Sequence, residues 1–231
     1  SCRGDIIALC DVDESKFDST LKGTIGNIIN TNNAAQGING SKYSAIFAPR
    51  VIYDLSAAET EAYDDNNIFP ASFHYLACAA YVHSNFAEWY AAAGYNRGIS
   101  ALTVKGVTVN YGNVAQNTLG PRVPLAIDND NTVTKAINLI ITERGNYYLW
   151  GNRTSFPLQA TGLRWSHYLN IRQLCTTIKK QVIYAGRMYA FDPNSDILWI
   201  NFRDAVEPLL QKMEGDQGIN GHKIVPVKDK V

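Results

Sequence analysis

The sequence predicts an α/β fold in which helices flank a mixed, largely parallel sheet. Short apolar runs rich in β-branched and aromatic residues alternate with longer segments of helical period. The first alternation, strand then helix then strand, has the spacing of a right-handed βαβ unit and favours parallel strands. The chain has 231 residues, of which 46% are hydrophobic, so it can bury a substantial core.

The first two expected strands lie near the beginning of the sequence. Residues 5–11 form a short apolar run typical of a buried strand, and residues 43–48 form a second run that Pro49 ends. Between them the apolar positions fit one face of a helix, although two glycines weaken this pattern: Phe17, Leu21, Ile25 and Ile28, with Gly23 and Gly26.

The middle of the sequence predicts a long buried helix between loops. Residues 56–68 are acidic and rich in Asn, which is typical of a solvated loop. Residues 70–83 predict a helix with Pro70 in its first turn, apolar nearly all round and therefore deeply buried. Residues 85–100 predict a loop, and 104–111 a weakly alternating strand.

Two further helices and a strand are expected before the last helix. After the Asp-Asn-Asp-Asn run at 128–131, Val133, Ile137 and Ile140 or Ile141 fit one face of a helix. The aromatic run at 147–150 predicts a buried strand. The clearest helix follows, with an apolar stripe and a polar face: Tyr168, Ile171, Cys175, Ile178 and Val182 on the stripe, and Arg172, Gln173, Lys179 and Lys180 facing away.

The last expected helix follows the turn at 192–196, which supplies its cap, and ends at Gly215. Its apolar stripe has helical spacing: Leu198, Phe202, Val206, Leu209 and Met213. Residues 222–231 are expected to be extended. The chain shows no repeat and no long linker, which predicts one domain over residues 1–231 and leaves open a small subdomain at about 100–145.

Composition and charge exclude several classes of function. Lys plus Arg and Asp plus Glu both number 21, so the basic excess of a nucleic-acid-binding domain is missing. No apolar run approaches the length of a membrane span, and no signal peptide is recognisable. The cysteines at 2, 10, 78 and 175 form no Cys-x-x-Cys pair and are expected to be free thiols.

The common motifs of catalysis and cofactor binding are missing from the sequence. Asp128 to Thr132 begins like a calcium loop but lacks the glycine and the closing glutamate that such a loop requires. The four histidines have no metal-ligand spacing. No phosphate-binding glycine loop and no serine nucleophile elbow occur. We therefore expect no catalytic, cofactor-binding or metal-binding residue, and no enzyme.

Several motifs in the same order resemble the contractile tail sheath protein of bacteriophages with contractile tails (myophages), with the giant phiKZ-like phages as a candidate subgroup. The Arg3–Asp11 and Ser44–Pro49 strands resemble the first strands of that family's core. The other matches are short motifs spread over most of the chain: Pro70 and Ser72; Trp89, Gly94, Asn96, Arg97 and Gly98; Trp150, Gly151, Arg153 and Thr154; Trp165, Asn170 and Arg172; Asp192, Pro193, Asn194 and Trp199. Gln173 and Ala92 depart from the family pattern.

The resemblance implies a structural subunit that forms stacked hexameric rings around a tail tube and contracts to drive the tube through the host envelope. Its implied partners are other copies of itself, the tube protein, and the baseplate and tail terminator proteins. Its implied location is the virion tail sheath, assembled in the host cytoplasm. The family's terminal arms, which add strands to neighbouring subunits, have no match here, so a monomeric core fragment is expected.

Two alternatives stay open beside the phage sheath. One is the sheath of a secretion system or tailocin, which works by the same mechanism. The other is an α/β enzyme or ligand-binding domain, which would need a deep pocket with convergent polar groups. For Arg153 the sequence favours a structural role, in which its guanidinium pairs with a carboxylate or with carbonyl groups inside the subunit.

Overall fold

A computed structural model of the chain describes residues 6–11, 42–54, 67–100, 102–107, 137–143, 145–156 and 165–225. It contains a sheet with mostly parallel strands and helices beside it, as the sequence predicts. Among these residues four strands make up this sheet, in the order β1-β2-β6-β7: β1 (Ala8–Asp11), β2 (Ser44–Ala48), β6 (Ile137–Glu143) and β7 (Asn146–Trp150). Strands β1, β2 and β6 are parallel, and β7 is antiparallel to β6.

A second, smaller sheet is antiparallel and was not expected. Its strand order is β4-β3-β5, and its strands are β3 (Val51–Tyr53), β4 (Ile68–Phe69) and β5 (Val104–Val107). Strand β3 follows β2 after only two residues, so the chain passes directly from one sheet into the other. Strand β5 confirms the start of the strand expected at 104–111, whose last residues lie outside the described part of the chain.

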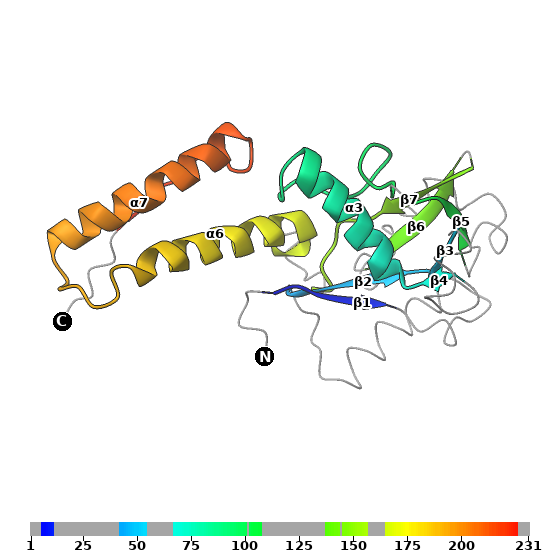
Figure 1. Cartoon of the computed structure of the whole chain (residues 1–231), viewed down its shortest axis with the longest axis horizontal. Coiled ribbons are helices and arrows are strands. Elements are labelled where there is room, and N and C mark those ends of the chain that lie inside the picture. The colour runs from blue at the N-terminus through cyan, green and yellow to red at the C-terminus, as the bar shows by residue number, and fades with distance from the viewer. Residues whose placement is uncertain are drawn as a thin grey trace, which may run out of the picture.

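In the described part of the chain, three α-helices accompany the sheets: α3 (Ala71–Asn85), α6 (Leu169–Arg187) and α7 (Asp196–Gly215). A short 3-10 helix, η3 (Trp165–His167), precedes α6. Figure 1 shows α3 lying across the strands, whereas α6 and α7 form a two-helix hairpin that extends away from them. Within the described ranges, no helix is both long and apolar enough to cross a membrane.

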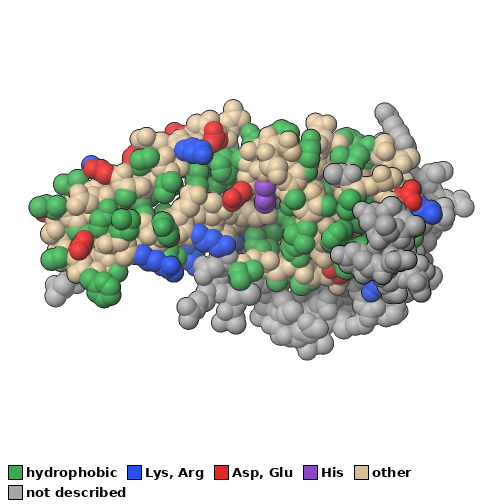
Figure 2. All heavy atoms as spheres, viewed as in Figure 1, with side chains coloured by type: hydrophobic (Ala, Val, Ile, Leu, Met, Phe, Trp, Pro, Cys, Tyr) green, Lys and Arg blue, Asp and Glu red, His purple; other side chains and the backbone are tan. Residues whose placement is uncertain are grey.

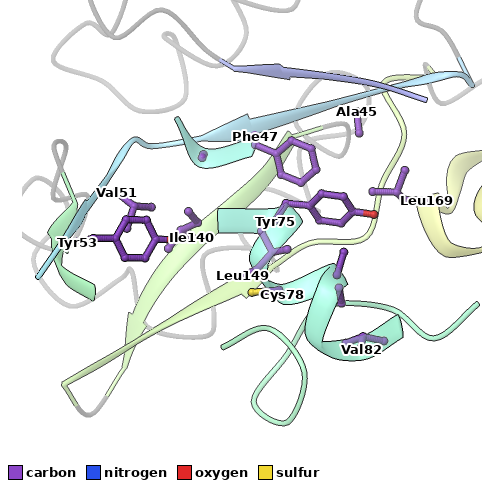
Figure 3. Close-up of a cluster of buried hydrophobic side chains, with 13 residues drawn as sticks. Ala45, Phe47, Val51, Tyr53, Tyr75, Cys78, Val82, Ile140, Leu149 and Leu169 are labelled. Atoms are coloured by element: carbon purple, nitrogen blue, oxygen red, sulfur yellow. The ribbon is translucent and has the colours of Figure 1, made fainter. Parts of the chain in front are cut away.

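The core forms where α3 packs against β2, β3 and β7. Phe47 of β2 and Tyr75 of α3 lie with ring centroids 4.8 Å apart, and Leu149 and Cys78 are fully buried beside them (Figure 3). The run at 44–48 is buried on both faces, because parallel strands in the middle of a sheet are covered on both sides. The buried strand predicted at 43–48 is therefore confirmed.

The helix predicted after residues 128–131 is wrong over its described part. Residues 137–143 form β6, which lies between β2 and β7. Leu139, Ile140 and Ile141 are all buried, so this central strand shows no polar alternation. A continuous apolar run of this kind fits a buried strand and a helix equally well when only its period is considered. The run forms a strand because it pairs with β2 on one side and with β7 on the other.

Two other burial predictions are corrected. Helix α3 exposes one of its faces, which includes Leu76 and Tyr81. Phe73 is also partly exposed, but its ring stacks on Phe69 of β4 at a centroid distance of 4.9 Å. Strand β1 is mostly exposed rather than buried, because it lies at the end of the described sheet. Leu149 is fully buried in β7, but the residues beside it are only partly covered.

Several predicted elements lie outside the described residues or only partly within them. The helix expected between residues 17 and 28 and the acidic segment at 56–66 lie wholly outside the described residues. The loop predicted at 85–100 contains no helix or strand after Asn85. Much of the subdomain considered at about 100–145 is also outside the described residues, while its two described pieces, β5 and β6, belong to the two sheets.

Candidate functional site: the joint between the sheet and the helical arm

The candidate site is the segment that leaves β7 and enters α6. We call it the joint and define it as residues 150–154 and 165–172. It connects the four-stranded sheet to the hairpin of α6 and α7, which we call the arm (Figure 1). Seven of the motif residues singled out in the sequence lie in it: Trp150, Gly151, Arg153, Thr154, Trp165, Asn170 and Arg172.

Asn138 of β6 holds the chain where it leaves β7. Its side chain is fully buried. Its Oδ1 accepts a hydrogen bond from the Arg153 amide at 2.7 Å, and its Nδ2 donates to the Arg153 carbonyl at 2.9 Å and to the Ile46 carbonyl at 3.1 Å. One side chain thus replaces the strand pairing that β7 gives up after Trp150, so both backbone groups of Arg153 have partners.

Gly151 is required by the close approach of Asn138. A Cβ atom at position 151 would lie 2.7 Å from both the Cα and the Oδ1 of Asn138. Any other residue would push β7 away from β6 at this point. The glycine in the Trp150-Gly-Asn-Arg-Thr154 motif therefore has a steric cause.

A pair of asparagines fixes the first turn of α6 against this segment. Asn152 Nδ2 donates to Asn170 Oδ1 at 2.6 Å, and the Asn170 amide donates to Asn152 Oδ1 at 3.2 Å. Asn170 Nδ2 also donates to the Trp89 carbonyl at 2.9 Å, and the Leu169 amide donates to the Asn152 carbonyl at 3.1 Å. Through its side chain and its carbonyl, Asn152 thus accepts from two amides that the start of a helix leaves without partners.

Thr154 closes the joint on its other side. Its hydroxyl donates to the Ser166 carbonyl at 2.8 Å, and its amide donates to the His167 carbonyl at 2.9 Å. Thr154 is almost fully buried. Both bonds tie the end of the β7 segment to η3, so the entrance to α6 cannot move without breaking buried hydrogen bonds.

Arg153 contacts an aromatic ring rather than the carboxylate or carbonyl groups that the sequence suggested. Its guanidinium lies over the Tyr168 ring at 4.7 Å from the centroid, and residues 153 and 168 also form an isolated β-bridge. Its Nη1 is buried and has no hydrogen-bond partner among the described residues. The contact still lies inside the subunit, so a clamp within the joint remains the role that we predict for Arg153.

Arg172 was expected to face away from the apolar stripe of α6, and this is corrected. It is 6% exposed, and its guanidinium lies 4.3 Å from the Tyr43 ring centroid and 5.4 Å from that of Trp165. Gln173 is likewise engaged, because its Nε2 donates to the Tyr75 hydroxyl at 2.6 Å. The first turns of α6 are enclosed on several sides, and periodicity alone predicts a single buried face.

The 94–98 loop lies against the outer edge of β7. The Gly94 amide donates to the Leu149 carbonyl at 2.9 Å, and the Leu149 amide donates to the Gly98 carbonyl at 2.7 Å. Gly94 has a φ of +81°, and a Cβ at Gly98 would lie 2.4 Å from the Leu149 carbonyl oxygen. Both glycines are therefore needed for this loop to cover the strand edge.

Side chains of the same loop add aromatic contacts. The Tyr95 ring lies against Tyr148 and Trp150 at centroid distances of 5.1 and 4.8 Å, and Arg97 lies over the Tyr90 ring at 5.1 Å. Asn96 is exposed at the turn. These contacts place the 94–98 motif beside Trp150 of the joint, although about fifty residues separate them in sequence.

Trp89 connects the joint to the end of the arm. Its Nε1 donates to the Asp216 carbonyl at 3.2 Å, and a Cβ at Gly218 would lie 3.0 Å from its indole ring. Because the Trp89 carbonyl also accepts from Asn170, this residue touches both the first turn of α6 and the end of α7. The two ends of the arm are thus fixed to the same part of the core.

The remaining motif residues lie elsewhere. Asp192, Pro193, Asn194 and Trp199 are at the far turn of the arm, where Trp199 Nε1 donates to Asn194 Oδ1 at 2.8 Å. Ser195 caps α7 by accepting from the Leu198 amide at 3.2 Å, which confirms the cap expected from the 192–196 turn.

Pro70 and Ser72 start α3 rather than entering the joint. Pro70 occupies the N-cap position just before the first helical turn. The amide and hydroxyl of Ser72 both donate to the Asp11 carboxylate at the end of β1. Asp11 therefore supplies the acceptor that the Pro70 cap cannot, at the helix end where a negative charge is favoured.

Asn138 is the main residue of the site that the sequence analysis did not single out. The signal was present, because Asn138 is a lone amide inside the run Ile137-Asn-Leu-Ile-Ile141. A polar side chain inside an apolar strand must find buried partners. Reading this run as a helix concealed that requirement.

The chemistry of the joint is that of a rigid connection. Amide, hydroxyl and backbone groups satisfy one another, and the two arginines lie against aromatic rings. Within the described ranges, no group of three or more His, Cys, Asp or Glu side chains is placed to hold a metal ion. An open groove between the start of β1, α3 and α6 is lined by both apolar and polar side chains: Ile6, Ile7, His83, Glu88, Gln173, Thr176, Thr177 and Lys180.

The fold defined by the sheet, the joint and the arm is that of chains from contractile injection machines. No protein-family model matches the sequence, and no curated protein matches it. Among solved structures, a chain of the anti-feeding prophage (AFP) baseplate matches with a TM-score of 0.61 and 19% identity, over 94% of this chain and 47% of that chain.

Two sheath structures match as well. The PVC sheath complex of an extracellular contractile injection system, in the contracted state, gives a TM-score of 0.60 at 19% identity, over 94% of this chain and 51% of that one. The AFP helical sheath in the contracted state gives a TM-score of 0.55 at 19% identity, over 94% of this chain and 48% of that chain. This chain therefore has their fold and spans about half the length of the chains it matches.

Proposed function

We propose that this chain is the core of a contractile sheath subunit, which polymerises around a tube and contracts to drive that tube through a cell envelope. The observation that carries the proposal is the match of the fold, over 94% of the chain, to sheath complexes in the contracted state. The sequence motifs that resemble tail sheath proteins are a second line of support, because seven of their residues come together in the joint.

The joint suits a subunit that moves as a rigid body. Contraction of a sheath requires two packings of the same subunit that differ in interface free energy. Buried hydrogen bonds from Asn138, Thr154 and the Asn152–Asn170 pair hold the arm at one angle to the sheet. A stiff subunit passes a rotation at one interface to the next without absorbing it internally.

Strand addition is the proposed route of polymerisation. In the described sheet, β1 lies at one end, whereas the other end, β7, is covered by the 94–98 loop. An uncovered edge offers backbone donors and acceptors to an extended segment of another subunit. In this proposal the partners are other copies of the protein first, and then the tube, baseplate and terminator proteins.

The machine to which the subunit belongs is a further part of the proposal. The motifs resemble phage tail sheaths, so we propose a phage virion tail, assembled in the host cytoplasm. The alternative is an injection system or tailocin, to which the structural neighbours lend support. Purified particles distinguish the two: capsids attached to contractile tails support the phage, and tails without capsids support the alternative.

Cryo-electron microscopy of the complete gene product tests the proposal. We expect hollow helical tubes or stacked rings in which each subunit contains this fold. A matched pair of variants makes the result specific: Gly151→Val, which forces β7 from Asn138, should abolish assembly, and Asn96→Ala, at an exposed loop position, should not. A complete protein that stays dispersed in the presence of its tube would contradict the proposed function.

A further inference from the structure

The arm exposes large apolar side chains on two opposite sides. On α6 and the turn that follows it, Tyr184 is 74% exposed, Met188 77% and Phe191 fully exposed. On α7, Ile197 is 70% exposed and Ile200 49%. Figure 2 shows apolar side chains over the far end of the arm. Exposed apolar groups gathered on one element usually mark a surface that another molecule covers.

These side chains do not hold the hairpin together. The inner faces of the helices meet at Phe202, which lies 3.6 Å from the position of a Cβ on Gly186 and contacts the Tyr189 ring at a centroid distance of 6.3 Å. Tyr184 lies on the far side of α6 from Gly186, and Ile200 on the far side of α7 from Phe202, because two residues turn a helix by about 200°. The exposed groups therefore point away from the partner helix.

The outer face of α6 is apolar and basic. Spacing of three and four residues places Lys180, Ile183, Tyr184 and Arg187 on this face, and all four are exposed. Between Leu169 and Arg187 the helix contains no Asp or Glu. Figure 2 shows Lys and Arg side chains along the lower edge of the arm, where α6 runs in Figure 1.

The outer face of α7 is apolar and carries the exposed carboxylate of Asp204, which His222 does not engage. Ile197, Ile200 and Asp204 share this face. Asp204 lies 3.3 Å from Arg203, and both side chains are more than half exposed, so their pairing is weak and open to exchange. Glu207 and Glu214 both contact His222 instead, because a carboxylate oxygen of each lies 3.0 Å from a ring nitrogen of that residue.

We propose that a second copy of this chain covers these faces, with the α6 face of one arm packed on the α7 face of the next. Each arm then presents a basic apolar face on one side and a carboxylate-bearing apolar face on the other. Two different complementary faces on one element give a head-to-tail contact that continues from copy to copy, as rings and helices require. This inference rests on the proposed function and names one of its interfaces.

The size of the contact predicts that it is weak in isolation. A helix of 19 residues is about 28 Å long and about 10 Å wide, so each face offers roughly 300 Å². A stable complex usually buries about 800 Å² on each partner. The chain should therefore be monomeric in dilute solution, and the arm contact should appear by covalent trapping.

Disulfide trapping between two variants with one exposed cysteine each tests the contact. Cys2, Cys10 and Cys175 are first replaced by Ser in the 231-residue chain, and buried Cys78 is kept. Tyr184→Cys is made in an untagged chain and Ile200→Cys in a chain with a mass tag, so that mixed and like pairs separate on a gel. Circular dichroism and melting temperature confirm that each variant is folded.

Head-to-tail packing predicts that the mixed 184–200 disulfide forms faster than either like pair, and faster than a random-collision control that pairs Ser84→Cys on α3 with Ile200→Cys. Like pairs that form as fast as the mixed pair would show a symmetric contact and overturn the proposal. A mixed pair no faster than the control would overturn it too.

Charge reversal gives the second readout. Adding Lys180→Glu and Arg187→Glu to the Tyr184→Cys chain should lower the mixed product about fivefold, because attraction between the basic face and Asp204 is replaced by repulsion. Adding Asp204→Lys to the Ile200→Cys chain should restore part of it, and no restoration would contradict the pairing of faces. Sheath tubes from the complete protein without trapping would leave the proposed function standing and this inference wrong.

Discussion

Asn138 shows how one buried amide determines the geometry of a joint. Its three hydrogen bonds reach the carbonyl of Ile46 in β2 and both backbone groups of Arg153. Replacing it by an apolar side chain of similar size would leave these buried groups without partners, and each unpaired group costs about 1–3 kcal/mol.

We expect Asn138→Leu to lower the free energy of unfolding by about 2–4 kcal/mol, because at least two buried backbone groups lose their partners. Urea denaturation of the 231-residue chain measures this difference. Asn96→Leu is the matched control, since Asn96 is exposed and its replacement should change stability by less than about 0.5 kcal/mol. Equal stabilities of the Asn138 variant and the wild type would mean that the joint tolerates an unpaired segment.

Arg153 provides a smaller prediction at the same site. A cation–π contact of this kind contributes about 0.5–1 kcal/mol, which corresponds to roughly 1–4 °C in a chain of this size. Arg153→Ala should therefore lower the melting temperature by that amount, and Arg153→Lys, which keeps the charge, by less. Unchanged stability together with failed assembly of the complete protein would assign Arg153 to an interface instead.

His74 makes stability depend on pH. The ring is fully buried, Nδ1 lies 2.8 Å from the Tyr53 hydroxyl, and burial lowers the pKa of His74 to about 4. The unfolded chain binds a proton at a pKa near 6.5, while the folded chain does not. Stability is therefore complete above about pH 6.5 and falls as the pH drops toward 4.

The largest loss attributable to His74 is about 3 kcal/mol near pH 4. Urea denaturation at pH 7, 6 and 5 should show this decline, and His74→Leu should flatten the part that belongs to this residue. His222 acts in the opposite sense, because hydrogen bonds to Glu207 and Glu214 raise its pKa. A decline of equal size in the His74→Leu protein would show that another group is responsible.

At the scale of elements, the sequence predicted the helices and strands whose residue pattern fits only one kind of secondary structure. Helix α7 was predicted from its capping turn to its end at Gly215, and helix α6 by its stripe at 168–182, because long amphipathic stripes and a capping turn are unambiguous. The helix predicted over residues 137–143 was wrong, because an apolar run of this length fits the period of a helix and that of a strand. The three-stranded sheet was missed, since strands of two to four residues are too short for their pairing to be read locally.

The candidate site could be predicted only in part. Gly151, Arg153, Thr154, Asn170 and Arg172 were named from motifs, but their convergence depends on contacts between distant parts of the chain. Arg172 was placed on the polar face because Tyr43 and Trp165, which enclose it, belong to other segments. Periodicity describes one helix, and a joint is a property of several elements together.

Strand β1 carries a prediction at this scale. The Ala8 amide donates to the Tyr43 carbonyl at 2.8 Å, so by alternation the Leu9 amide points to the other side, toward the end of the sheet. Leu9→Pro would remove that outward donor without removing a bond to β2. We expect it to block assembly of the complete protein, whereas Leu9→Ala assembles. Normal tubes from the Leu9→Pro protein, seen by electron microscopy, would show that this edge receives no strand.

At the scale of the whole molecule, the sheet and the arm are two bodies connected at one place. The joint fixes the start of α6, and Trp89 links that start to the end of α7 through its carbonyl and its indole. An arm attached at both of its ends should keep one direction relative to the sheet. A sheath subunit needs that property if rotation at one interface is to move the next.

Distance measurements by electron spin resonance test this rigidity directly. Spin labels at Ser84→Cys on α3 and Met188→Cys at the far end of the arm, in a chain whose Cys2, Cys10 and Cys175 are replaced, report the position of the arm relative to the sheet. We expect a narrow distribution in that chain and a broad one after Asn152→Ala with Asn170→Ala, since the first turn of α6 then loses its polar partners. Asn96→Ala, outside the joint, should leave the distribution narrow. If the double variant stayed as narrow as its parent, apolar packing alone would hold the arm, and the asparagine pair would have to be assigned to stability rather than to orientation.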